Sequence, residues 1–264
     1  MPTATRGGWR GAVPTGYARF AVGRTEVVAR EDVQRAVKEA MSDGSLYRYA
    51  ERHPRARSFA GRSVVWASPL PDGRTHVVVR HSSHGGLFAR LTGDRFVAPT
   101  RAPHELAAAL RLADAGVPTP EVLAYAVYPA GPWLRRADVA TREIARGHDL
   151  AWVFLHPPEA AARQAILGAV ERLLGQLLRA GARHPDLNLK NVLLAPLDAA
   201  DPVAHVLDVD RVEFGAPGDP AIWHANLARP QRSARKWRTR FGALMSEREL
   251  AFAMPRAGRE ERPA

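Results

Sequence analysis

The sequence contains no cysteine, and this absence excludes several kinds of chemistry at once. Without thiols the chain forms no disulfide bond, binds no metal through thiolates and has no cysteine nucleophile. Long apolar runs are also missing, since no stretch approaches the roughly 18 apolar residues that identify a membrane span. The basic N-terminus, MPTATRGGWRG, is not followed by the apolar segment of a signal peptide. We therefore expect a soluble protein of the cytoplasm.

Lysine is nearly as scarce, because Lys38, Lys190 and Lys236 are the only lysines among 38 lysine and arginine residues. The net charge of +11 is compatible with an anionic partner such as nucleic acid, a membrane surface or a phosphorylated substrate. The arginine bias and abundant alanine equally fit the codon usage of a GC-rich genome, so composition does not decide. The densest cluster is RPQRSARKWRTR, residues 229–240, much of which fits one solvated helix face.

The N-terminal half reads as strands with little helix. A length of 264 residues with 46% apolar residues suffices for one large domain or two small lobes. Alternating apolar residues and the turn signals Gly23-Arg24 and Asp72-Gly73 predict two hairpins. The expected strands are 17–22, 25–29, 63–66, 75–80, 122–128 and 138–144, and the expected helices are 31–41 and 105–115.

The C-terminal half is predominantly helical. Residues 159–180 form the strongest helical pattern, because Ile166, Val170, Leu173, Leu174 and Leu177 share one stripe. The predicted secondary structure changes from mainly strands to mainly helices near residues 143–149, which predicts a hinge between a β-rich and a helical part. Beyond the long helix we expect short strands at 192–194 and 205–210, then basic helices.

The stretch RHPDLNLKNVLL, residues 183–194, places Asp186 and Asn191 in a loop after the long helix. Asp208 follows on the expected strand 205–210. Carboxylate and amide oxygens suit Mg²⁺ and suit zinc poorly. Phosphoryl transfer needs such a set, since one carboxylate accepts the proton of the attacking hydroxyl while an aspartate and an asparagine hold metal ions on the phosphates. A lone Asp186 would more often be a cap or turn residue, but the three together favour catalysis.

Two neighbouring residues have open roles. His184 more often packs within such a loop than performs acid–base catalysis. Asp210 either adds a metal ligand or pairs with Arg211, and the sequence slightly favours the pairing.

The motif HPDLNLKN, residues 184–191, resembles the catalytic loop H-x-D-x-x-x-x-N of the protein-kinase-like superfamily, and LDVD, residues 207–210, resembles its metal-binding loop. More narrowly, DLN-x-x-N followed by an apolar strand and D-x-D-R is similar to the lipopolysaccharide kinase (Kdo/WaaP) family, in particular its 3-deoxy-D-manno-octulosonic acid (Kdo) kinases. VVVRHSSHGGL (77–87), T-R-x-x-x-E (100–105) and GVPTP (116–120) agree in order. The resemblance runs from about Gly61 to Lys236.

The resemblance implies an α+β fold, the two-lobed protein-kinase-like fold, with a small β-rich N-lobe containing one main helix and a reduced, mostly helical C-lobe. We expect residues 1–60 to be an N-terminal extension packing on the N-lobe, 61–146 the N-lobe, and 147–264 the C-lobe with basic C-terminal helices. ATP would bind between the lobes. The implied activity is transfer of phosphate from ATP to a sugar hydroxyl of the lipopolysaccharide inner core, most often Kdo on lipid A.

The same resemblance assigns roles in the second half of the chain. Asp186 would be the catalytic base, and Asn191 and Asp208 would bind Mg²⁺. Lys190 would contact phosphate or sugar, although a solvated cation is equally natural. Glu143 and Ile144 would lie at the hinge, where backbone groups meet adenine.

In the first half the match to kinases is less complete. Kinases place a lysine on the third strand to hold the phosphates, paired with a helical glutamate. Here Arg80 takes that place, with Glu105 as its partner, and arginine is not a direct replacement for lysine. The expected glycine-rich loop offers only Gly61, and Gly85-Gly86 would let backbone approach phosphate. G-x-G-x-x-G is absent.

The acceptor remains open at this stage. Pro185 stands where regulated protein kinases have an arginine that reads a phosphorylated loop, so a small or glycolipid acceptor is favoured. The cluster 229–240 would hold the protein on the anionic cytoplasmic face of the inner membrane. Other readings are an aminoglycoside-type or protein kinase, or a pseudokinase that binds nucleotide or membrane without catalysis. Nothing beyond charge supports nucleic-acid binding.

Overall fold

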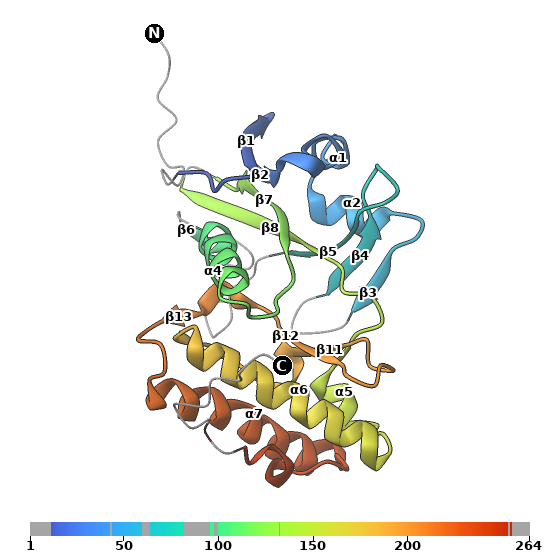
Figure 1. The fold of residues 1–264 in the computed structure, drawn as a ribbon. Helices are drawn as coiled ribbons and strands as arrows, with labels where there is room; N and C mark the ends of the chain where they lie inside the picture. The colour runs from blue at the N-terminus through green and yellow to red at the C-terminus, as the bar shows by residue number, and fades with distance from the viewer. Residues whose placement is uncertain are drawn as a thin grey trace, which may run out of the picture. The chain divides into compact units, whose positions relative to one another are not determined.

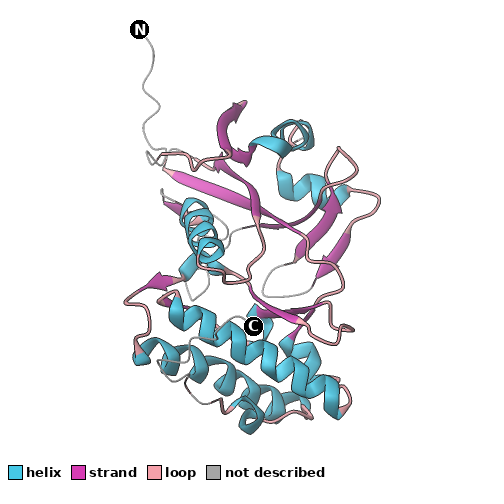
Figure 2. Cartoon of the chain, viewed as in Figure 1, coloured by secondary structure: helices cyan, strands magenta, loops and turns pink. Residues whose placement is uncertain are grey.

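The structure, a computed structural model, describes residues 12–42, 44–59, 64–81, 96–97, 100–131, 133–252 and 254. The chain divides into two compact units: the first consists of Met1–Ala107 and Glu121–Glu143, and the second of Ala108–Pro120 and Ile144–Ala264. Strands predominate in the first unit and helices in the second (Figure 2). One change of unit falls between Glu143 and Ile144, at the start of the segment 143–149. The division of the sequence at residues 60 and 146 stays a prediction.

In the described part of the chain, the first unit is built on an eight-stranded antiparallel sheet (Figure 1). The strand order is β1-β2-β7-β8-β5-β4-β3, and β6 pairs with β8. The strands are β1 (Tyr17–Val22), β2 (Thr25–Arg30), β3 (Arg57–Phe59), β4 (Val65–Pro69), β5 (His76–His81), β6 (Phe96–Val97), β7 (Val122–Pro129) and β8 (Leu134–Arg142).

Turn residues form both predicted hairpins. Gly23 has φ 58° between β1 and β2, a conformation that costs glycine nothing. Between β4 and β5, Asp72 Oδ1 accepts hydrogen bonds from the N–H groups of Arg74 (3.0 Å) and Thr75 (2.9 Å). The predicted strand 63–66 begins outside the described residues, and β4 itself runs from Val65 to Pro69.

Two elements begin earlier than the sequence predicts. Helix α4 (Ala102–Asp114) starts three residues before Glu105, because Pro103 suits a first turn, where no N–H partner is needed. Strand β8 starts four residues before Asp138, since β7 pairs with it as far as Pro129 opposite Arg135. Arginines at the start of β8 conceal the strand from a hydrophobic pattern.

Two short helices from the first sixty residues pack on the sheet of the first unit. The predicted helix 31–41 is a 3₁₀ turn, η1 (Glu31–Val33), followed by α1 (Gln34–Ala40). Helix α2 (Leu46–Arg52) was not predicted, because seven residues show too little periodicity. The shared core includes Val33, Val37, Leu46, Ala50, Val77, Val79 and Leu123.

A buried carboxylate fastens α2 to the sheet. Asp138 on β8 is fully buried. Its Oδ2 accepts the Tyr47 N–H at 3.0 Å, and its Oδ1 lies 2.6 Å from His81 Nδ1 on β5. The Tyr128 hydroxyl accepts the N–H of Leu46 at 3.0 Å. Burial, followed by the charge of Asp138, raises the pKa of Tyr128, so this hydroxyl stays protonated.

In the described part of the chain, the second unit contains the end of α4 from Ala108 on, three further α-helices and two small sheets. The helices are α5 (Leu150–Leu155), α6 (Ala160–Arg179) and α7 (Pro220–Phe241), and α6 and α7 lie side by side (Figure 1). One sheet has the order β12-β11-β9, and β10 pairs with β13. These strands are β9 (His148–Asp149), β10 (Ala182–Arg183), β11 (Val192–Ala195), β12 (Val203–Val206) and β13 (Glu213–Phe214).

Helix ends in the second unit follow local sequence rules. Glu159 is the N-cap of α6, close to the predicted start, and the predicted apolar stripe of α6 is buried. Asp219 caps α7 by accepting the Ala221 N–H at 2.8 Å, and Gly242 ends it with φ 63°. Among the described residues, none of the helices combines the length and the apolar character that crossing a bilayer requires.

Replacing Asp138 by alanine should lower the free energy of unfolding by about 2–3 kcal/mol, because the Tyr47 N–H loses its buried acceptor. Chemical denaturation measures this change. Asp32→Ala is the matched control, since Asp32 forms an exposed pair with Arg30 and its loss should cost less than about 1 kcal/mol. Equal stability of the two variants would contradict a structural role for Asp138.

Candidate functional site

The loop that carries Asp186 begins at a glycine that no other residue can replace without rearrangement. Gly181 has φ 64°, and a Cβ there would lie 2.4 Å from the backbone oxygen of Gly215. The chain then enters β10, which pairs with β13. Asn226 of α7, itself buried, donates from Nδ2 to Ala182 O at 2.8 Å and accepts the His184 N–H at 2.9 Å. Two elements thus fix the start of the loop.

His184 joins this loop to the segment before Asp208. Its ring is buried, and its Nδ1 accepts the backbone N–H of Asp186 at 3.1 Å. A neutral imidazole has one donor and one acceptor, so Nε2 carries the proton and donates to Leu207 O at 3.0 Å. Both ring nitrogens therefore form hydrogen bonds with backbone groups, which agrees with the expectation that His184 packs in the loop.

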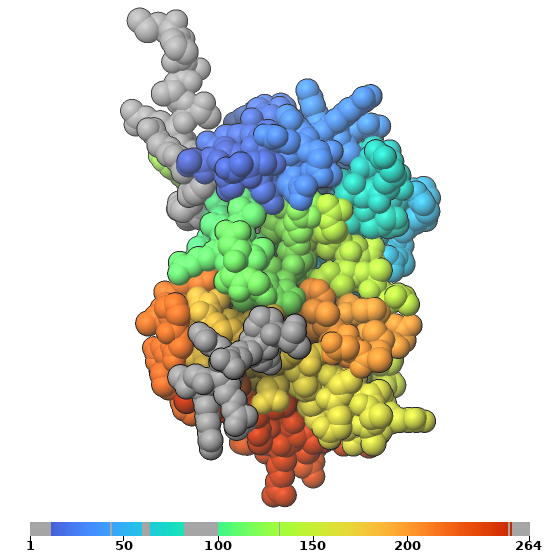
Figure 3. All heavy atoms as spheres, viewed as in Figure 1, coloured from blue at the N-terminus to red at the C-terminus, as the bar shows by residue number. Residues whose placement is uncertain are grey.

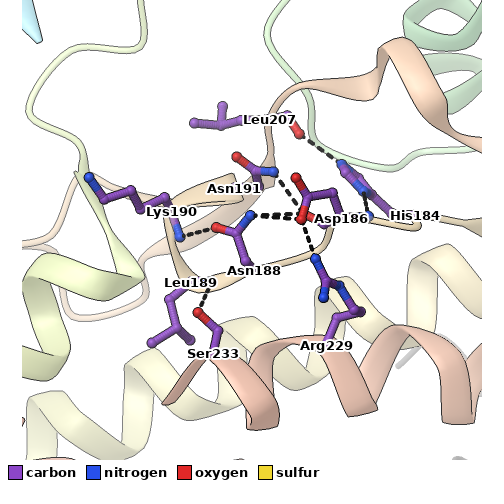
Figure 4. Close-up of polar contacts among 9 residues, drawn as sticks. All are labelled: His184, Asp186, Asn188, Leu189, Lys190, Asn191, Leu207, Arg229 and Ser233. Carbon is purple, nitrogen blue, oxygen red and sulfur yellow. Dashed lines mark hydrogen bonds and ion pairs between the residues drawn. The ribbon is translucent and has the colours of Figure 1, made fainter. Parts of the chain in front are cut away.

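The Asp186 side chain is held by two donors (Figure 4). Asn188 Nδ2 donates to its Oδ1 at 3.2 Å, and Arg229 of α7 forms an ion pair with the same oxygen. The Asp186 side chain is 15% exposed. Its backbone oxygen accepts hydrogen bonds from the N–H of Asn188 at 2.7 Å and from Asn191 Nδ2 at 2.7 Å. The loop is thus a tight, mutually bonded turn.

Asn191 connects the two segments through side chain and backbone. It ends the 3₁₀ turn η2 (Leu189–Asn191). Because Nδ2 donates to Asp186, Oδ1 is the amide atom suited to a cation. The backbone oxygen of Asn191 accepts the Leu207 N–H at 2.9 Å. Leu207 is therefore bonded through its N–H to Asn191 and through its oxygen to His184.

Asp208 directly follows Leu207, but not on a strand. The prediction of a strand over 205–210 is wrong, because β12 ends at Val206. Asp208 has φ 57° and ψ 55° and precedes the 3₁₀ turn η3 (Val209–Arg211), which contains Asp210. Aspartate adopts this left-handed conformation more readily than most residues. Strained backbone of this kind is concentrated at functional sites.

The donor set of this region fits a hard divalent cation. Asn191 offers an amide oxygen and Asp208 a carboxylate, which are ligand types that Mg²⁺ accepts. Within the described ranges, no three residues among His, Cys, Asp and Glu gather in the manner of a metal site.

Lys190 lies at the outer side of the same loop. Its N–H donates to Asn188 Oδ1 at 2.9 Å, and its Nζ lies 5.7 Å from the centroid of the Trp237 ring. Burial raises the pKa of the Asp149 carboxyl, while the Trp152 N–H and the charge of Lys190 act in the opposite direction. Lys190 therefore has an aromatic and an anionic neighbour rather than solvent alone.

The other predicted site residues belong to the first unit or, in the case of Ile144, directly follow its boundary at Glu143. Arg80 on β5 and Glu105 on α4 form an ion pair in which the glutamate is buried. Glu143 pairs with Arg57, and its N–H donates to His76 O at 3.0 Å. Ile144, the first residue of the second unit after this boundary, is half-buried. Gly61, Gly85 and Gly86 lie outside the described residues.

Sequence reasoning missed two residues of this site. Arg229 was seen only as part of a basic cluster, and Asn226 was not singled out. A polar residue in an otherwise apolar helical stripe was the available signal for Asn226. No local pattern could connect Arg229 to Asp186, because their contact depends on how α7 packs.

Comparison with known proteins gives the family. Residues 49–247 match the model of the lipopolysaccharide kinase (Kdo/WaaP) family. A protein of Vibrio parahaemolyticus named 3-deoxy-D-manno-octulosonic acid kinase is 28% identical over 203 residues, 72% of this chain and 80% of the relative. A protein of Xanthomonas oryzae with the same name is 31% identical over 206 residues, 75% and 77% of the two chains.

Heptose kinases are also similar. The lipopolysaccharide core heptose(I) kinase WaaP of Pseudomonas aeruginosa is 31% identical over 151 residues, 54% of this chain and 56% of the relative. A solved structure, WaaP in complex with acyl carrier protein, superposes with a TM-score of 0.52 at 22% identity and covers 85% of this chain and 91% of that chain. The predicted protein-kinase-like fold is thereby confirmed, and this chain belongs to the lipopolysaccharide kinase (Kdo/WaaP) family.

Proposed function

We propose that this protein transfers the γ-phosphoryl group of ATP to a sugar hydroxyl of the lipopolysaccharide inner core, with Kdo on lipid A as the acceptor. Relatives named Kdo kinase that align with about 70% or more of this chain support the acceptor. The observation that carries the proposal is the double attachment of Leu207, which binds the segment of Asp208 to the loop of Asp186 and Asn191.

Asp186 accepts the proton of the attacking hydroxyl in this mechanism. Phosphoryl transfer requires little covalent chemistry from a protein, so orientation of the hydroxyl is the main task of the base. The contacts to the backbone oxygen and to Oδ1 of Asp186 support this role, because they restrict both its main chain and its carboxylate.

Asn191 Oδ1 and the Asp208 carboxylate hold Mg²⁺ in this proposal. Held there, the ion would neutralise the negative charge that develops on the transferring phosphoryl group. The support comes from donor chemistry: the Asn191 amide is turned so that its nitrogen faces Asp186. Asp210, in the adjacent 3₁₀ turn, is left without an assigned role.

Arg80, oriented by Glu105, steadies the phosphates of ATP. The buried glutamate restrains the arginine, whose planar guanidinium binds phosphate through two parallel hydrogen bonds. Backbone groups of Glu143 and Ile144 form hydrogen bonds with the adenine of ATP in this proposal. Lys190 contacts a phosphate of ATP or the acceptor sugar. Gly61, which is outside the described residues, is kept in this proposal as the glycine expected to approach the phosphates.

The last turns of α7 and the segment after it carry the proposed membrane contact. They lie at the molecular surface, coloured red in Figure 3. Exposed cations, Lys236, Arg238 and Arg240, stand beside Phe241, which is 50% exposed, and Leu244, which is 71% exposed. Each cation near an anionic surface contributes about 1 kcal/mol, and exposed apolar side chains enter the interface. These side chains support the proposal that the protein binds peripherally to the cytoplasmic face of the inner membrane.

Incubation of Kdo-lipid A with the protein and Mg²⁺-ATP should add one phosphate, which mass spectrometry detects. Asp186→Asn should reduce the rate about 10²- to 10⁴-fold, the usual contribution of a general base. An unchanged rate in the variant would contradict the role of Asp186. Transfer only to a heptose-containing core would show that the acceptor is heptose and not Kdo. Transfer only to soluble sugars would contradict the proposal of a glycolipid acceptor. No transfer to any acceptor, with nucleotide still bound, would indicate a pseudokinase.

Removal of divalent cations with EDTA should abolish transfer, and excess Mg²⁺ should restore it. Asn191→Ala and Asp208→Asn should each raise the Mg²⁺ concentration for half-maximal rate roughly tenfold or more, because a metal ligand is lost. Titration of the initial rate with Mg²⁺ measures this shift. Asp201→Asn, which neutralises an exposed carboxylate of the same unit, is the control. A normal Mg²⁺ requirement in both site variants would exclude them as ligands.

A further inference from the structure

One face of α7 contacts the catalytic loop along the whole length of the loop. Side chains three or four positions apart in a helix share a face, and four such residues contact the loop in chain order. Asn226, in the second turn of α7, binds the backbone of Ala182 and His184. Arg229, one turn later, forms the ion pair with Asp186.

The second half of this face contacts the end of the loop. Ser233 Oγ accepts the N–H of Leu189 at 3.4 Å, and the ring of Trp237 lies under Lys190 Nζ. Arg229 and Ser233 point from α7 toward the loop in Figure 4. We name Asn226, Arg229, Ser233 and Trp237 the loop-facing stripe. Through this stripe, α7 fixes the conformation of the loop at four positions along its length.

Arg229 is the member of the stripe that contacts the carboxylate of the proposed base, Asp186. The terminal torsion of an aspartate is broad, so a carboxylate needs partners to hold one orientation. Arg229 and Asn188 both donate to Oδ1 of Asp186. Asn188 belongs to the same loop and moves with it, whereas Arg229 is anchored on a 22-residue helix.

The geometry of Arg229 is not the one that stability alone would favour. Its Nε is buried and has no hydrogen-bond partner in the structure. A buried donor without a partner costs free energy, and residues that violate such a rule tend to lie at functional sites. The guanidinium thus pairs with Asp186 while its Nε has no partner in the structure.

We propose that Arg229 is a positioning residue, which fixes the Asp186 carboxylate for the acceptor hydroxyl, with the loop-facing stripe setting the register between α7 and the loop. This inference rests on the proposed function of Asp186. It assigns Arg229 to orientation of the base and not to membrane contact, although Arg229 opens the cluster 229–240.

Steady-state kinetics of Arg229→Gln test the proposal. We expect kcat to fall about 10- to 100-fold, the cost of a misplaced reacting group, with KM for ATP unchanged. Arg229→Lys keeps the charge without the planar fork and should recover part of the loss. Arg179→Gln removes the same charge from an exposed position of α6 and should leave kcat unchanged. Thermal unfolding of each variant verifies folding, and Arg229→Lys carries the test if the glutamine variant does not fold.

A double-mutant cycle with Asp186→Asn separates positioning from other roles. If Arg229 acts through Asp186, then Arg229→Gln causes no further loss of kcat in the Asp186→Asn background. Independent, multiplying losses would overturn the proposal, and so would a rise in kcat, which would mean that the ion pair competes with the acceptor. Full activity of Asp186→Asn alone would instead refute the proposed function. Loss in Asp186→Asn with normal kinetics in Arg229→Gln would refute only the positioning role.

Discussion

Leu207 is bonded through both of its backbone polar groups to the loop that contains Asp186. Its N–H donates a hydrogen bond to the backbone oxygen of Asn191, and its backbone oxygen accepts a hydrogen bond from His184 Nε2. The His184 ring is at the same time the acceptor for the Asp186 N–H. One buried imidazole therefore binds both the backbone N–H of Asp186 and the oxygen of the residue that precedes Asp208, and neither segment can shift without breaking a buried hydrogen bond.

Both units use a buried side chain to satisfy backbone groups where secondary structure ends. Asp138 accepts the Tyr47 N–H in the first turn of α2 in the first unit, and Asn226 holds the backbone of Ala182 and His184 at the start of the Asp186 loop in the second. Such groups are costly to bury unless every partner is present. They consequently specify the position of short elements that sequence periodicity does not reveal, as the unpredicted α2 shows.

The sequence predicted the elements that long apolar patterns or turn residues define, such as α6 and the hairpins at Gly23 and Gly73. It also predicted the family and the protein-kinase-like fold, because the loop motif keeps a fixed spacing of residues that chemistry requires. It placed Asp208 on a strand, since the apolar run 205–209 gives no sign that the backbone turns left-handed after Leu207. The contact of Arg229 with Asp186 could not be predicted from the sequence, because the side of α7 that faces the loop depends on packing against the rest of the unit.

Arg80 gives the protein a chemical property that kinases with a strand lysine lack. A guanidinium stays protonated and is a poor nucleophile, whereas a lysine amine is readily acylated. Nucleotide reagents that label an active-site amine would therefore find no target at this position of β5. The chain has only three lysines, Lys38, Lys190 and Lys236, and none of them lies on β5.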